Sequence, residues 1–302
     1  MPPVLRIAAQ YRSAMGVFDW LRSWWGFRPA PRTETPPPDD VSTSSTLGPG
    51  RTTGAPPSGN GASSFHLLWD LPGEFVAVAV DFEVLRPPQV KKLYFWALQA
   101  NFTDQHGRNG GGAHFGLQYH PEYPGSTAVN WGGYGSGGGE LEGSAAALAG
   151  SLGNPHTRDF AWQPQRRYRF RIELAPPADQ PRDGRTAWQG TVTDVSTATA
   201  TLVRMLYTRG DRLVDPIVWS EVFAHCEHPE VEVRWSGFEA TDFNGDSHRP
   251  DTIRLNYQAP EQGGCANTDS APGSAGSILQ RTNVRRDHAQ GSRISLAEGP
   301  NP

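Results

Sequence analysis

A strict alternation of side chains over residues 167–174 constrains the fold most strongly. The stretch RYRFRIEL places an apolar side chain at every second position, from Tyr168 to Leu174, and a charged one before each of them. This period of two is typical of a β-strand with one buried and one solvated face. Similar stretches recur at intervals of roughly 10–20 residues, with turn residues between them: 74–85, 92–102, 113–120, 127–131, 186–195, 201–208, 216–225, 231–241 and 252–257. About ten such strands predict an all-β, jelly-roll-like sandwich of two sheets.

Composition agrees with this fold class and excludes others. The chain of 302 residues holds 34 Gly and 27 Pro, which argues against a helical bundle. Its 10 Trp, 8 Tyr and 13 Phe supply a core that a wholly disordered chain lacks. No apolar run approaches 18 residues, so a multispanning membrane protein is excluded. The net charge of −4 removes the general electrostatic case for a nucleic-acid partner.

The chain divides into four parts. Residues 1–28 place Trp20, Leu21 and Trp24 at three- and four-residue spacing, which predicts a short Trp-rich amphipathic helix that docks on protein or, as the second choice, on a membrane surface. Residues 29–64 contain 25 Pro, Gly, Ser or Thr, which predicts a disordered linker. Residues 65–258 form the sandwich. Residues 259–302 form a loop-rich tail, either loosely attached or packed on the sandwich.

The N-terminal sequence and the two cysteines indicate in which cellular compartment the protein is expected. No apolar region of 7–15 residues follows the first arginines, so a standard signal peptide is absent and the default expectation is the cytoplasm. Cys226 and Cys265 are too few for a disulfide framework. They form either one bridge, if the protein is exported, or two buried thiols.

Several motifs follow one another in a recognisable order. They are YFWALQ (94–99), HFGLQ (114–118), NWGG (130–133), and Trp162 followed by YRFRI (168–172). Together they resemble an uncharacterised bacterial family known as domain of unknown function 3472. The stretch WQGTVTD (188–194) is similar to a strand of concanavalin-like and laminin-G-like jelly rolls. The resemblance covers roughly residues 66–258 and implies a jelly-roll-like fold, but it brings no established activity.

Two neighbouring strands carry a polar face. If residues 94–102 pair with 113–120, amides and a histidine meet on one surface. The expected contacts are Gln99, Asn101, His114 and Gln118, with Asn130 and Trp131 nearby. Such groups bind sugar hydroxyls and stack on sugar rings. They favour a non-catalytic carbohydrate-binding module, and the alternative is a solvated outer face without a ligand.

Three acidic residues keep an enzyme open as an alternative, namely a glycan-acting hydrolase or lyase on the same scaffold. Glu140 and Glu142 would share a face if they lie on a strand. Glu221 lies two residues after Trp219, on the same face of a predicted strand. Burial there would raise the pKa of Glu221 and let it act as a catalytic acid, unless it pairs with an arginine such as Arg234. A third class of function is a protein-interaction scaffold.

One motif bears on metal binding. Asp242, Asn244 and Asp246 occupy the first, third and fifth positions of a calcium-loop pattern. The pattern then fails, because Ser247 replaces the expected Gly and Ile253 the expected Glu. We expect an Asn-Gly hairpin turn and no cofactor, with calcium as the alternative.

Overall fold

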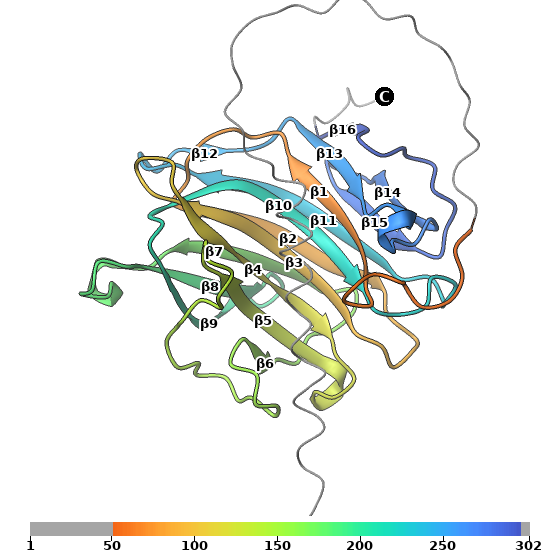
Figure 1. The fold of residues 1–302 in the computed structure, drawn as a ribbon, viewed down its shortest axis with the longest axis horizontal. Helices are drawn as coiled ribbons and strands as arrows, with labels where there is room; N and C mark the ends of the chain where they lie inside the picture. The colour runs from red at the N-terminus through yellow and green to blue at the C-terminus, as the bar shows by residue number, and fades with distance from the viewer. Residues whose placement is uncertain (1–50, 297–302) are drawn as a thin grey trace, which may run out of the picture.

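The computed structural model describes residues 51–296, which form two antiparallel sheets packed face to face (Figure 1). The strands of the first sheet lie in the order β16 (Arg293–Ser295), β13 (Thr252–Tyr257), β1 (Ser63–Trp69), β10 (Arg212–Val222), β3 (Tyr94–Thr103), β4 (Asn109–Tyr119), β5 (Thr127–Tyr134) and β6 (Thr157–Asp159). Those of the second sheet lie in the order β14 (Thr268–Pro272), β15 (Ile278–Thr282), β11 (Glu232–Thr241), β2 (Ala77–Arg86), β7 (Arg167–Leu174), β8 (Thr186–Asp194) and β9 (Thr199–Thr208), and β12 (Ser247–His248) pairs with β11. The prediction of an all-β sandwich is confirmed.

Short 3₁₀ turns complete the described secondary structure. They span η2 (Pro124–Ser126), η3 (Pro177–Asp179) and η4 (Pro260–Gln262). None of the helices in residues 51–296 has the length and the apolar character needed to cross a membrane.

In strand β7 the alternating side chains pack on one face and form ion pairs on the other. Its aromatic residues Tyr168 and Phe170 are buried between the sheets. Its arginines point to the other side of the second sheet, where the Nη1 of Arg169 donates to the Oδ1 of Asp81 at 2.8 Å and its Nη2 donates to the Oε2 of Glu239 at 3.0 Å. The expected division into a buried and a charged face is therefore confirmed for this strand.

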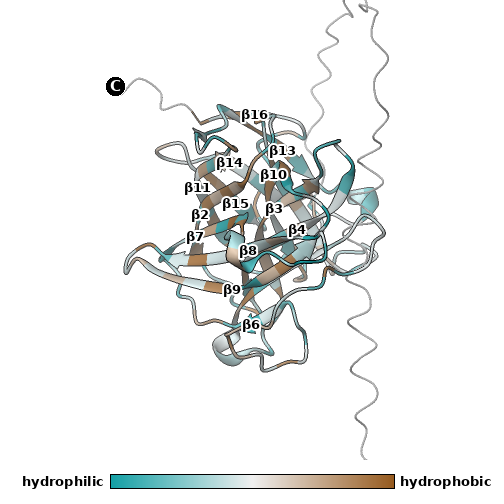
Figure 2. Ribbon diagram, turned by 90° about the vertical axis from the view of Figure 1, so that its left-hand side faces the viewer, coloured by the Kyte–Doolittle hydropathy of each residue, from teal (hydrophilic) through white to brown (hydrophobic). Residues whose placement is uncertain are grey.

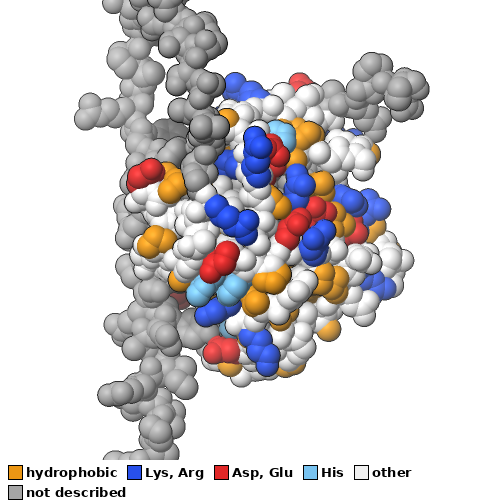
Figure 3. Space-filling model, turned by 90° about the vertical axis from the view of Figure 1, so that its right-hand side faces the viewer, with side chains coloured by type: hydrophobic (Ala, Val, Ile, Leu, Met, Phe, Trp, Pro, Cys, Tyr) orange, Lys and Arg blue, Asp and Glu red, His pale blue; other side chains and the backbone are white. Residues whose placement is uncertain are grey.

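The core between the sheets is built mainly from aromatic residues. Trp96, Trp131, Trp188 and Trp235 are among the largest fully buried side chains. Hydrophobic residues accordingly line the strands where the two layers face each other (Figure 2). In contrast, the face seen in Figure 3 carries basic and acidic side chains interspersed, without a large area of one sign.

The structure moves two of the expected domain boundaries. The linker was expected to extend to residue 64, but β1 begins at Ser63, and residues 51–62 are described and hydrogen-bonded to the sandwich. The tail from residue 259 contributes β14 and β15 to the second sheet and β16 to the first, because β15 pairs with β11, β14 with β15, and β16 with β13. The expected helix at 1–28 and the linker as far as residue 50 lie outside the described residues.

Candidate functional site

The first sheet has a second face, directed away from the core. In β1, β10, β3 and β4 the side chains that alternate with the core residues point to this side, which we call the outer face. One cross-strand row on it consists of Ser64, Glu221, Phe95 and Gln118. The next consists of His66, Trp219, Ala97, Gly116 and Asn130, and a third of Leu68, Ile217, Gln99, His114 and Gly132.

Three rings occupy the middle of the outer face. Phe95 and Trp219 meet edge to face with ring centroids 4.8 Å apart, and His114 lies 5.5 Å from Phe95 and 5.8 Å from Trp219. Such T-shaped contacts are favourable and hold each ring in one orientation. Both aromatic residues are buried, so neither presents an open ring face to solvent.

Glu221 is the one carboxyl among these outer-face residues. It is 5% exposed, and its Oε1 accepts a hydrogen bond from the Nδ2 of Asn60 at 2.8 Å. Burial raises the pKa of Glu221 to about 7, and the hydrogen bond from Asn60 opposes this rise. The expected alternative, a pair with Arg234, is wrong, because Arg234 lies in the second sheet and donates to Glu83 at 3.0 Å.

Gln118 stands in the same row as Glu221, on the other side of Phe95. Two strand spacings separate their Cα atoms, or about 10 Å. Gln118 is 6% exposed, and its buried Oε1 has no hydrogen-bond partner among the described residues. A buried acceptor without a donor is costly and calls for a ligand or a water to satisfy it.

Two buried histidines, His66 and His114, stand in the neighbouring rows and add no positive charge. Burial lowers the pKa of His66 to about 4, opposed by a backbone hydrogen bond at Asn256. Burial and the nearby His156 lower the pKa of His114 to about 3, opposed by a hydrogen bond with Asn130. Both imidazoles are therefore neutral at pH 7, and they do not offset the cost of ionising Glu221.

The structure brings together most of the residues expected to bind a ligand. Gln99, His114, Gln118 and Asn130 lie on the outer face, and Asn101 continues the alternation of β3 beyond Gln99. Their function as contacts of a carbohydrate stays a prediction.

Trp131 is the exception, because the prediction that it joins this face is wrong. It is fully buried between the sheets, where it packs edge to face against Phe115 at 5.7 Å. Neighbouring residues of a strand point to opposite faces, so Asn130 and Trp131 cannot both face outward.

Each of the other acidic candidates binds a basic side chain. The Oε2 of Glu140 lies 3.1 Å from the Nε2 of His156, and the Oε2 of Glu142 accepts from the Nη1 of Arg185 at 2.6 Å. Both carboxylates are largely exposed. The expected carboxylate pair is therefore not formed, because neither residue lies within a named strand and each acid binds a different basic group.

The expected calcium motif forms a turn between β11 and β12. The Oδ1 of Asp242 accepts hydrogen bonds from the backbone N–H groups of Asn244 and Asp246, and its Oδ2 lies 3.0 Å from the Nε2 of His248. Residues 51–296 contain no group of three His, Cys, Asp or Glu side chains arranged to hold a metal ion. Calcium binding at this turn stays a prediction.

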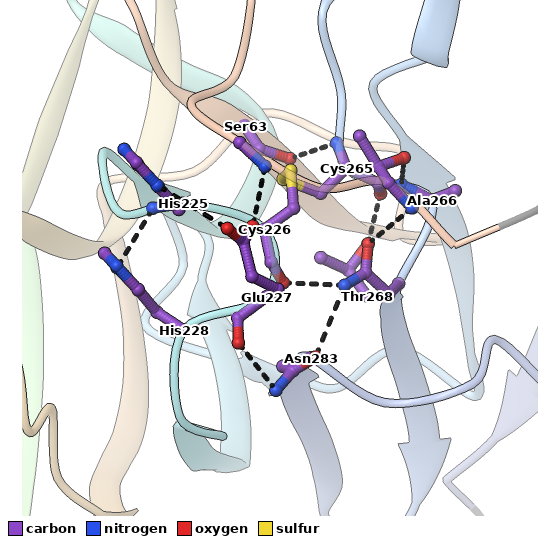
Figure 4. Close-up of a disulfide and its surroundings, with 12 residues drawn as sticks. Ser63, His225, Cys226, Glu227, His228, Cys265, Ala266, Thr268 and Asn283 are labelled. Carbon is purple, nitrogen blue, oxygen red and sulfur yellow. Dashed lines mark hydrogen bonds and ion pairs between the residues drawn. A yellow bond between two sulfur atoms is a disulfide. The ribbon is translucent and has the colours of Figure 1, made fainter.

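Cys226 and Cys265 form one disulfide and not two buried thiols, with Cα atoms 5.5 Å apart (Figure 4). The bridge joins the segment after β10 to the segment before β14. Around it, the N–H of Cys265 donates to the Oγ of Ser63 at 2.8 Å, and the N–H of Ala266 donates to the Oγ1 of Thr52 at 2.9 Å. These and further hydrogen bonds attach residues 52–63 to the two segments that the disulfide joins.

Two residues of the site escaped the sequence analysis. Asn60 lies in a Gly/Ser-rich stretch whose composition is typical of a linker, and no local pattern marks it. His66 had a usable signal, because it alternates with Phe65 and Leu67 in the first apolar stretch after the linker.

No family model and no curated protein matches this chain. Among solved structures, scytalido-glutamic peptidase with a peptide-based transition state analog is similar with a TM-score of 0.43 at 8% identity, covering 72% of this chain and 97% of that one. A native glycosidic hydrolase has a TM-score of 0.23 at 9% identity, covering 53% of this chain and 77% of that one. The alginate lyase vAL-1 from Chlorella virus has a TM-score of 0.25 at 11% identity, covering 62% of this chain and 88% of that one.

Proposed function

We propose that the outer face of the first sheet is the active site of a hydrolase, with Glu221 as the acid–base group. The observation that carries this proposal is the row containing Glu221 and Gln118 on either side of Phe95. It joins a buried carboxyl with a pKa near neutrality to a buried amide whose oxygen lacks a donor. Perturbed acids and unsatisfied polar groups of this kind concentrate at functional sites.

The two side chains supply complementary parts of a hydrolysis. A water that donates one hydrogen bond to the Glu221 carboxylate and one to the Gln118 Oε1 satisfies both groups. Glu221 accepts a proton from this water as its oxygen attacks a carbonyl carbon, and the amide N–H of Gln118 stabilises the resulting oxyanion. Glu221 then returns the proton to the leaving nitrogen or oxygen, so a carboxyl with a pKa of about 7 serves in both steps.

This pairing favours an acyl substrate, such as a peptide, over a glycoside. Most glycoside hydrolases need two carboxyls about 5–9.5 Å apart. Glu221 has no such partner in the three rows, where its row partner is an amide, and the exposed carboxylate of Glu140 binds His156. A non-catalytic carbohydrate module gains less support, because no described Trp or Tyr ranks among the exposed large hydrophobic residues, which are Val195, Leu202 and Phe243.

The test is a cleavage assay on the purified chain with two substrate panels. Quenched fluorescent peptides and denatured protein form the first panel, and neutral and acidic polysaccharides form the second. We expect peptide cleavage that increases with pH through about 7 and decreases about 10²-fold or more in Glu221→Gln. Glu142→Gln is the control, because that exposed carboxylate binds Arg185 away from this row.

Other outcomes discriminate among the alternatives. Cleavage of polysaccharides alone would assign the chain to the glycan-acting class. Binding of a polysaccharide without cleavage in either panel would return the face to a carbohydrate-binding module. Equal cleavage by the wild type and Glu221→Gln would remove Glu221 from the reaction.

A further inference from the structure

The carboxyl of Glu221 is held from one side by a segment that enters the sandwich before β1. The Nδ2 of Asn60 donates to the Oε1 of Glu221 at 2.8 Å, although the two residues are 161 positions apart in the chain. Ser64 lies directly opposite Glu221 on β1 and Phe95 directly opposite on β3. Neither of these neighbours carries a charge.

The orientation of the Asn60 amide is fixed by its own surroundings. Its Oδ1 accepts hydrogen bonds from the N–H of Ala62 at 3.1 Å and from the Oγ of Ser58 at 3.0 Å. The oxygen end is thereby committed to the local turn, and the donor end must face Glu221. A flipped amide would lose the bond from the Ala62 N–H and would place two oxygens against each other at Glu221.

The segment that carries Asn60 is anchored at its start. The N–H of Gly54 donates to the Oε2 of Glu227 at 2.7 Å, and the N–H of Cys226 donates to the carbonyl oxygen of Gly54 at 2.9 Å. Glu227 and Cys226 lie at the disulfide, as Figure 4 shows. Asn60 is therefore held between the disulfide and β1, so its donor stays at the carboxyl.

We propose that Asn60 is a positioning residue that assigns the two oxygens of Glu221 to different tasks, an inference that rests on the proposed function. Oε1 already accepts a hydrogen bond from a fixed N–H donor, so a proton on the carboxyl resides on Oε2. Oε2 is then the oxygen that exchanges a proton with substrate or water. Asn60 touches neither the substrate nor the reacting atoms and acts through Glu221 alone.

The groups that face Glu221 make its titration a clean reporter of Asn60. The nearest titratable side chain on β1 is His66, opposite Trp219, and β4 presents the uncharged Gln118. From β5, Tyr134 senses the carboxylate, because burial raises the pKa of its phenol and the charges of Glu140 and Glu221 add to the rise. Asn60 provides the hydrogen bond that favours the ionised form of Glu221.

Two variants separate positioning from support of the local turn. Asn60→Ala removes the donor and also the acceptor used by Ala62. Asn60→Asp keeps an oxygen for Ala62 and Ser58 but places a second oxygen against Glu221. A purely structural role would leave the midpoint of Glu221 unchanged in a folded Asn60→Ala, whereas a positioning role raises it, and Asn60→Asp shows how strongly the carboxyl responds to a charge at this position.

The measurement is an NMR titration of carbon-13-labelled Glu side chains in the full chain, with Glu221→Gln to assign the signal. We expect the midpoint of Glu221 to increase by about one pH unit or more in Asn60→Ala and by more in Asn60→Asp, which adds a like charge. The pH limb of cleavage should move by the same amount. If Asn60→Ala fails to fold, the titration of Asn60→Ser decides, because Ser keeps a short acceptor for the local turn but lacks the amide donor that reaches Glu221.

An unchanged midpoint in a folded variant overturns the inference. This result is distinct from failure of the proposed function, which Glu221→Gln tests directly. If Glu221→Gln still cleaves while the Asn60 variants shift the titration, Asn60 positions the carboxyl but the carboxyl is not the acid–base group.

Discussion

The indole Nε1 of Trp219 donates a hydrogen bond to the Oε1 of Gln99 at 2.9 Å, from β10 to β3. The two residues are diagonal neighbours on the outer face, because Trp219 lies opposite Ala97 and Gln99 opposite Ile217. The bond engages the oxygen of the Gln99 amide. It also holds the Trp219 ring against Phe95, next to Glu221.

Replacing Trp219 by Phe should therefore lower the free energy of unfolding by more than the loss of buried ring area alone accounts for. The Oε1 of Gln99, in a side chain that is 4% exposed, would lose its donor. We expect the free energy of unfolding to fall by about 1–3 kcal/mol, measured by urea denaturation at constant pH. The double variant Trp219→Phe with Gln99→Met is the control, because removing both polar partners should recover part of the loss. A double variant that is less stable than the single one would contradict this account.

Glu221 should make the stability of the protein depend on pH between about 4.5 and 7. A carboxyl with a raised pKa in the folded state holds its proton there while the unfolded chain has lost it. Stability is therefore lost as the pH rises through this range, by about 3 kcal/mol for a change in pKa from 4.5 to about 7. Glu221→Gln, which remains neutral, should be the more stable protein at pH 7 but not at pH 4.5.

Thermal unfolding of both proteins at these two pH values checks the prediction. A difference in Tm that is the same at pH 4.5 and pH 7 would show that the carboxyl titrates normally in the folded state.

The strands were predictable because their signal is local. Tyr168 and Phe170 alternate with arginines whatever lies elsewhere in the chain, and the resulting strand β7 covers residues 167–174 as expected. The same parity rule, applied to residues 130 and 131, would have placed Trp131 in the core once Asn130 was put on the outer face. The error at Trp131 thus came from grouping neighbours by chemistry rather than by the period of the strand.

The site itself could be predicted only in part. Gln99, His114 and Gln118 follow from the pairing of two consecutive strands. Asn60 meets Glu221 because β1 pairs with β10 and because hydrogen bonds hold the preceding segment beside the disulfide, and both sets of contacts join distant parts of the chain. A composition rich in Gly, Pro and Ser describes the entropy of residues 51–62 but not the side chains that bind them.

His114 should give the free energy of unfolding a pH dependence opposite to that of Glu221, with stability lost as the pH falls. Its pKa is lowered to about 3 in the folded state, chiefly by burial, so the unfolded chain binds a proton that the folded chain does not. Stability is lost as the pH falls below the unfolded pKa of about 6.5. His114→Gln should flatten this decline between pH 6.5 and pH 4.

The measurement is the midpoint of urea unfolding for both proteins across that range. His106, which is exposed, provides the control, and His106→Gln should leave the slope of the wild type unchanged. A decline in His114→Gln as steep as in the wild type would contradict the prediction.

The Cys226–Cys265 disulfide should stabilise the sandwich and also preserve the state of Glu221. It spans a sequence separation of 39 residues, for which the loss of chain entropy in the unfolded state corresponds to about 4 kcal/mol. The double variant Cys226→Ala with Cys265→Ala should lower the Tm accordingly. Since the segment that carries Asn60 is hydrogen-bonded to residues at both ends of the bridge, the variant should also raise the titration midpoint of Glu221 in the same direction as Asn60→Ala. Unfolding curves with and without reductant, together with the Glu221 titration, test both effects. A large loss of Tm with an unchanged midpoint would show that the disulfide stabilises the sandwich while Asn60 keeps its place by the contacts of Ser58 and Ala62 alone.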